Sequence, residues 1–195
     1  MEKHVYSVFS SLILESTDTE FECREDLLKW IANYMETDTD GIVLSNRGGW
    51  QSSSGRFFKE DKTFRPFSEY ISQRIGHLIN DVISVPVEIT DLWINVNRPG
   101  SYNVEHNHPE SDIAGCIWIH GPEESGNFVL KNPNGFVDFK LINALTDDVR
   151  LTSHVVIHAP TPGKMILFPS HLKHLVETNN SNEDRVSIAF NLSFV

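Results

Sequence analysis

Residues 87–97 read VEITDLWINVN, and apolar side chains alternate with polar ones along most of this stretch. Alternation with a period of two is typical of a β-strand that has one buried face. Similar short segments, separated by Gly, Pro and Asn, continue to the end of the chain. We expect further strands over residues 104–108, 114–120, 127–131, 137–143, 154–159, 164–169, 174–178 and 185–194. This many strands in so short a stretch predict a β-sandwich or jelly roll.

The region before this stretch has a different pattern. Residues 5–15 are rich in β-branched and aromatic side chains and predict a strand. Apolar residues recur at helical spacing over residues 25–36 and 64–83, which predicts two helices packed against one sheet. Residues 38–62 are rich in Gly, Ser, Asn and Asp, so we expect a surface loop with Trp50 as its anchor.

Length and composition favour one domain over residues 1–195, with an N-terminal part of strand, helices and loop (1–85) and a jelly-roll core (86–195). The net charge of −11 weighs against a nucleic-acid substrate. No apolar run approaches the length of a membrane span, and the N-terminus lacks the features of a signal peptide, so we expect a cytoplasmic protein. Cys23 and Cys116 fit no metal-binding spacing and are expected to be reduced thiols.

Residues 104–112 read VEHNHPESD and offer several side chains that bind metals. On an extended strand, His106, His108 and Glu110 would project to the same side. A later stretch, residues 168–176, adds His174 at the start of another expected strand. Imidazole and carboxylate groups on one face can bind a transition metal and leave other coordination positions open. The alternative interpretation is a polar strand end without a metal.

Two sets of ligands are open at this point. In the first, His106, His108 and His174 form an all-histidine face. In the second, His108 and Glu110 are the neighbouring pair, His174 completes the site, and His106 only supports it. We expect the remaining histidines of the strand-rich region to be non-ligands: His120, His154, His158 and His171.

Residues 185–191, RVSIAFN, form an expected strand on which Arg185 and Ser187 share a face with Ala189 and Asn191. An arginine that points inward requires an anionic partner, because an unpaired buried guanidinium is costly. A dicarboxylate ligand would meet that requirement. An exposed salt bridge is the alternative for Arg185.

Taken in order, these motifs resemble the 2-oxoglutarate and iron(II)-dependent oxygenases found in bacterial and phage genomes. The segments that carry the resemblance are residues 93–100, 106–109, 114–118, 168–170 with His174, and 185–191. The resemblance implies a double-stranded β-helix, a cupin-like jelly roll, with an iron(II) site on one face. Similarity to the nucleic-acid-demethylating oxygenases further implies that Asn95 and Asn97 contact 2-oxoglutarate. This sequence departs from the broad superfamily at His108, where Asp or Glu is usual.

The resemblance therefore implies a dioxygenase, a hydroxylase that couples decarboxylation of 2-oxoglutarate to succinate with oxidation of a C–H bond. Iron(II) and 2-oxoglutarate are the implied cofactor and co-substrate, and ascorbate is an auxiliary reductant. Arg185 and Ser187 would hold the distal carboxylate of 2-oxoglutarate. The rival functions are a cupin-like metal enzyme without 2-oxoglutarate and a non-catalytic binding module. We expect a monomer or homodimer that acts on a small molecule or a protein, without membrane or nucleic-acid partners. Three segments are expected to shape the entrance: residues 38–62, 123–125 and 146–150.

Overall fold

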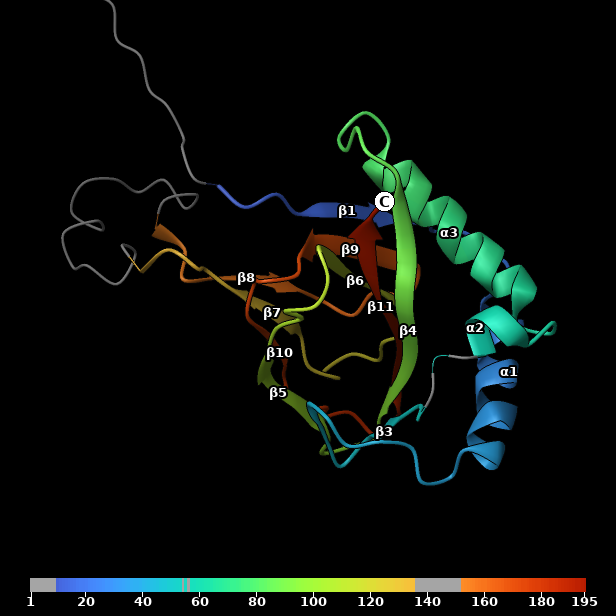
Figure 1. Ribbon diagram of the computed structural model, residues 1–195. Helices are drawn as coiled ribbons and strands as arrows, with labels where there is room; N and C mark the ends of the chain where they lie inside the picture. Colours follow the sequence, from blue (N-terminus) through green and yellow to red (C-terminus); the bar gives the residue numbers. More distant parts are fainter. Residues whose placement is uncertain (1–9, 54, 56, 136–151) are drawn as a thin grey trace, which may run out of the picture.

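The computed structural model describes residues 10–53, 55, 57–135 and 152–195, and its centre is a pair of antiparallel sheets (Figure 1). The strands are β1 (Leu14–Thr17), β2 (Asn46–Arg47), β3 (Trp50–Gln51), β4 (Val87–Asn97), β5 (Tyr102–His106), β6 (Ile113–His120), β7 (Phe128–Lys131), β8 (Val155–His158), β9 (Lys164–Pro169), β10 (His174–Val176) and β11 (Arg185–Phe194). The larger sheet has the order β1-β9-β6-β11-β4-β3, and the smaller has the order β2-β5-β10-β7-β8. Consecutive strands thus often lie in different sheets, as in a jelly roll.

Helices α1 (Arg24–Thr37), α2 (Phe57–Glu60) and α3 (Arg65–Ile79) lie on the outer side of the larger sheet (Figure 1). Pro66 stands in the first turn of α3, where a missing backbone N–H costs nothing. The apolar faces of the helices bury Leu27, Ile31 and Ile71 in one core with residues of the larger sheet. None of the described helices is both long and apolar enough to span a membrane.

Alternation along β4 separates two cores. Leu92 and Ile94 belong to the core under the helices, whereas Trp93 and Asn95 face the space between the sheets. The core between the sheets is formed by Ala114, Cys116, Trp118, Phe128, Leu130, Ile166, Phe168 and Leu172. Strand β4 therefore presents polar side chains to the interior of the sandwich, where they must find partners or a ligand.

The register of β11 continues this pattern on the next strand. Arg185 lies opposite Asn97, and Ser187 lies opposite Asn95. A register shift between Asn191 and Leu192 marks a β-bulge near the other end of β11. The inward faces of β4 and β11 thus place two polar pairs side by side, followed by the apolar pair of Trp93 and Ala189.

The strand bounds expected at residues 87–97, 164–169 and 185–194 agree with the structure, and the expected helices are present. Residues 38–62 are more ordered than a plain surface loop, because they contain β2, β3 and α2. Trp50 anchors them: its side chain is buried, and its Nε1 donates to the carbonyl of Asp38 at 2.7 Å. Of the strand expected at residues 5–15, residues 5–9 lie outside the described residues, and from residue 10 onward the strand present is β1, which begins at Leu14. The strand expected at residues 137–143 also lies outside the described residues.

Candidate metal centre

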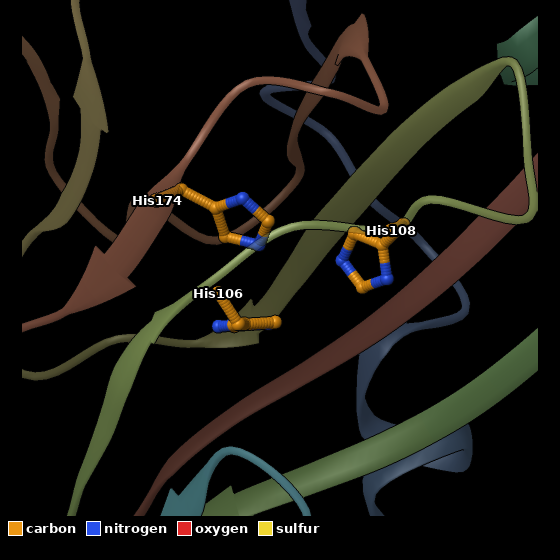
Figure 2. Close-up of side chains that lie close together, drawn as sticks. All are labelled: His106, His108 and His174. Carbon is orange, nitrogen blue, oxygen red and sulfur yellow. The ribbon is translucent and has the colours of Figure 1, made fainter.

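Three imidazoles converge at one end of the smaller sheet. His174 is the first residue of β10 and pairs with His106, the last residue of β5, while His108 follows β5 by two residues. The potential ligand atoms of the three rings all lie within 4.8 Å of one another, and Figure 2 shows the rings gathered from these segments. Two nitrogens that bind one ion at about 2.1 Å can be at most about 4.2 Å apart, so only small side-chain movements separate this arrangement from a coordinated one.

Main-chain carbonyls fix the tautomers of two of these rings. Nδ1 of His106 lies 2.8 Å from the carbonyl oxygen of Val104, and Nδ1 of His174 lies 3.0 Å from that of Leu172. A carbonyl oxygen only accepts, so each Nδ1 carries the hydrogen and donates it. The lone pair then resides on Nε2 of each ring, which is the arrangement that metal-binding histidines show.

Burial keeps these imidazoles neutral. It lowers the pKa of His106, and burial together with the neighbouring His106 lowers the pKa of His108 to about 4 and that of His174 to about 3. Aromatic rings supply part of this burial, since Phe128 and Phe168 lie 5.1 Å and 5.0 Å from the His174 ring centroid. At neutral pH three lone pairs are therefore available to a cation without the loss of a proton.

A cavity of about 50 Å³ extends from the three imidazoles into the space between the sheets and ends at Arg185. The Arg185 side chain is only 1% exposed. Its Nη1 donates to the carbonyls of Gly126 at 3.1 Å and Glu177 at 3.2 Å, and also to that of Ser125. Its Nη2 is buried without a hydrogen-bond partner among the described residues.

The charge of Arg185 is only partly matched, because the carboxylate of Glu177 raises its pKa but forms no salt bridge with it. In the part of the chain that the structure describes, no carboxylate forms a salt bridge with it. Burial lowers its pKa to about 10, so the guanidinium is still protonated at neutral pH. A buried cation with a free N–H group facing a cavity is a site for an anion.

The other expected ligand-binding residues have distinct positions. Asn95 and Ser187 line the cavity, and Oδ1 of Asn95 is buried without a partner among the described residues. Asn97 also lines it, but its Nδ2 donates to Oδ1 of Asn103 at 3.0 Å and so ties β4 to β5. The structure does not bring Glu110 to the imidazoles: it is exposed in the turn after β5 and is absent from the group of potential ligands.

Several residues that line the cavity were not identified as site residues from the sequence, among them Cys116 and Trp93. Cys116 lines the cavity from β6, and Trp93 lines it from β4, with its ring centroid 5.6 Å from that of His108. Alternation along the two strands was the available signal, since Cys116 lies two residues from Trp118 and Trp93 lies two residues from Asn95.

A second, wider pocket of about 600 Å³ opens on the other side of His106 and His108. Part of the expected entrance segment lines it, namely Ile42, Leu44, Ser45, Gln51, Ser52, Ser53 and Gly55. Residues 123–125 do not line it; the main-chain carbonyl of Ser125 instead accepts a hydrogen bond from Arg185. Residues 146–150 lie outside the described residues. His106 and His108 thus line both the small cavity and the wide pocket, whereas His174 lines only the small cavity.

Comparisons with known proteins place the chain in a family. The model of the family described as "Putative 2OG-Fe(II) oxygenase" matches residues 91–191. No curated protein matches the sequence.

Solved structures show the same fold. A prolyl hydroxylase from Trichoplax adhaerens, in complex with a peptide fragment of hypoxia inducible factor, has a TM-score of 0.62 at 14% identity, over 93% of this chain and 82% of that one. HygX from Streptomyces hygroscopicus, with nickel and 2-oxoglutarate bound, has a TM-score of 0.64 at 11% identity, over 93% and 82%. An oxidoreductase of the 2OG-Fe(II) oxygenase family from Burkholderia pseudomallei is 21% identical, with a TM-score of 0.49; this chain spans 56% of its length, and 66% of this chain is covered. The first two likenesses confirm the prediction of a double-stranded β-helix.

Proposed function

This chain belongs to the 2OG-Fe(II) oxygenase family, and from that membership we propose that it is a hydroxylase that holds iron(II) on His106, His108 and His174. Bound iron(II), 2-oxoglutarate and dioxygen together supply the oxidation: one oxygen atom enters a C–H bond of the substrate, the other enters succinate, and carbon dioxide leaves. The chain itself supplies the ligands, the orientation of both organic molecules and a pocket that excludes water.

The donor set fits iron(II). Three neutral imidazoles on one side of an ion leave the opposite side free for a chelating co-substrate and for oxygen. Because none of the three imidazoles is charged, the carboxylates of the bound co-substrate must balance the charge of the iron. His106 and His174 enter this arrangement with their Nε2 lone pairs already set by main-chain carbonyls.

The observation that carries the proposal is the buried guanidinium of Arg185, which has no salt-bridge partner among the described residues. It lies in the same cavity as the three imidazoles, with Nη2 buried and unpartnered among the described residues. A ligand that binds the metal at one end and carries a carboxylate at the other would satisfy both groups at once, and 2-oxoglutarate has this form. Ser187 can donate its hydroxyl to the same carboxylate, and a rotated Asn95 amide can donate its Nδ2.

Asn97 acts differently in this proposal. Its side chain is already bonded to Asn103, and its carbonyl accepts from Nδ2 of Asn179 at 2.8 Å. We infer that Asn97 positions β4 beside Arg185 and does not itself bind the co-substrate.

The wide pocket beside His106 and His108 is the place for the substrate, a small molecule or a protein. The two cavities meet at the imidazoles, so the co-substrate and the substrate would approach the metal from different sides. This arrangement keeps the co-substrate between the sheets while the substrate enters from solvent.

Succinate release tests the proposal. The purified chain, supplied with iron(II), ascorbate to keep the metal reduced, and 2-oxoglutarate, is expected to form succinate, and Arg185→Gln is expected to abolish this at the same 2-oxoglutarate concentration. Folded protein that binds neither iron nor 2-oxoglutarate would refute the function.

A further inference from the structure

The wide pocket beside the imidazoles combines an apolar wall with a single formal charge. Ile42, Leu44 and Val104 provide aliphatic surface. Among the described residues that line the pocket, Asp91 is the one with a formal charge, and Trp93 is its aromatic residue. The inward alternation of β4 places Asp91 one step from Trp93, and Trp93 contacts His108.

Asp91 has no cationic partner in the described part of the chain. Nδ2 of Asn191 donates a long hydrogen bond of 3.5 Å to Oδ2 of Asp91. Because Nδ2 of Asn191 faces the carboxylate, Oδ1 of the same amide is left as a free acceptor. That oxygen is buried and has no partner among the described residues, and Asn191 lines the same pocket.

Asp91 is exposed in the pocket, and apart from Nδ2 of Asn191 no donor of the described residues reaches its carboxylate or Oδ1 of Asn191. A carboxylate and an amide oxygen side by side are satisfied by a group with several N–H donors and a positive charge. The indole of Trp93 adds a surface that attracts cations. The aliphatic wall suits the methylene stem that carries such a group in lysine or arginine.

From these contacts we infer that the substrate carries a cationic amine or guanidinium on an aliphatic chain, as lysine and arginine do, and that Asp91 with Asn191 determines this specificity. The inference rests on the proposed function, because it assigns the substrate of the same site. The net charge of −11 favours the approach of such a group.

Binding to the nickel-loaded protein with 2-oxoglutarate tests this inference by calorimetry, without turnover. The probes are free L-lysine, free L-arginine, blocked pentapeptides with one central lysine or arginine, and the same pentapeptide with norleucine, which keeps the stem and lacks the charge. We expect one of the cationic probes to bind about tenfold to a hundredfold more tightly than norleucine, as for a charge-assisted hydrogen bond. Tight binding of the free amino acids identifies a small amine as the source, and tight binding of the pentapeptides alone identifies a protein.

Substitutions then assign the preference to Asp91. Asp91→Asn should remove it, and Asp91→Lys should favour a pentapeptide with central glutamate. Glu105→Gln is the matched control: it removes one negative charge from β5 in the other sheet, and Glu105 does not line the pocket, so the preference should remain. Affinity for the norleucine probe that equals the affinity for every cationic probe, no binding of any cationic probe, or an unchanged preference in Asp91→Asn would each overturn the inference.

The same titrations test the proposed function separately, because they also measure the binding of 2-oxoglutarate. Failure of 2-oxoglutarate to bind the nickel-loaded chain would refute the co-substrate site. If the unaltered chain binds 2-oxoglutarate but shows no preference for cationic probes, only the assignment of the substrate is refuted.

Discussion

Replacement of Arg185 by Gln should weaken the binding of 2-oxoglutarate far more than it changes the fold. Nη1 is occupied by three carbonyls, so the group left for a ligand is Nη2, with one or two hydrogen bonds. A hydrogen bond to a charged group contributes about 1.5–3 kcal/mol, so the loss of one or two such bonds is about 1.5–6 kcal/mol in total. At about 1.4 kcal/mol for each factor of ten, the dissociation constant should rise by about tenfold to 20,000-fold.

Calorimetry on the nickel-loaded protein measures this effect, and a second ligand isolates it. 2-Oxopentanoate has the same keto-acid end as 2-oxoglutarate but lacks the distal carboxylate. The unaltered protein should prefer 2-oxoglutarate by the same factor, and Arg185→Gln should lose this preference. Thermal unfolding of the variant shows whether the freed carbonyls of the 125–126 segment disturb the fold.

Arg74→Gln is the control for the loss of a partly buried arginine. Nη2 of Arg74 also donates to main-chain carbonyls, those of Ser16 at 3.2 Å and Gly163 at 3.1 Å, but Arg74 does not line the cavity. This variant should lose stability and keep its affinity for 2-oxoglutarate. A folded Arg185→Gln variant that binds 2-oxoglutarate within twofold of the unaltered protein would refute the reasoning.

Two further predictions concern stability. The pKa values of about 4 for His108 and about 3 for His174 lie below the ordinary 6.5. Below pH 6.5 these two histidines are therefore protonated in the unfolded chain but remain neutral in the folded chain. The metal-free protein should lose stability as the pH falls from 6.5 to 4, by up to about 1.4 kcal/mol per pH unit for each histidine, and His108→Asn should reduce this slope in urea unfolding; an unchanged slope would contradict the assignment. Phe190→Ala removes a fully buried ring from β11 and should cost about 3–5 kcal/mol in the same assay, and a cost below about 1 kcal/mol would show that the core is packed differently.

The strands that the sequence predicted well lie in the larger sheet, which is covered on both faces. Strands β4, β9 and β11 have a helix-covered face and an inner face, so they contain long alternating or continuous apolar segments that are easy to recognise. Strands β2 and β3 contain two residues each and pair with distant β5 and β4, so their local signal is too short to recognise. Gly41 and Gly48, with φ of +56° and +76°, give the backbone turns that this compact segment needs.

The histidine motif was visible in the sequence, but the choice between its two ligand sets was not. Alternation treated residues 106–110 as one extended strand, with Glu110 beside His108. The strand instead ends at His106 and the chain turns after Pro109, so the period-two argument fails beyond His108. The proximity of His174 to His106 depends on the register between β10 and β5, which no local pattern specifies.

Equilibrium binding of iron(II) under anaerobic conditions tests most directly whether the three imidazoles form the metal site. We expect one iron per chain, an affinity that falls by at least about a hundredfold in His174→Ala, and no change in Glu110→Gln. Iron binding that survives in His174→Ala, or that is lost in Glu110→Gln, would contradict the all-histidine centre.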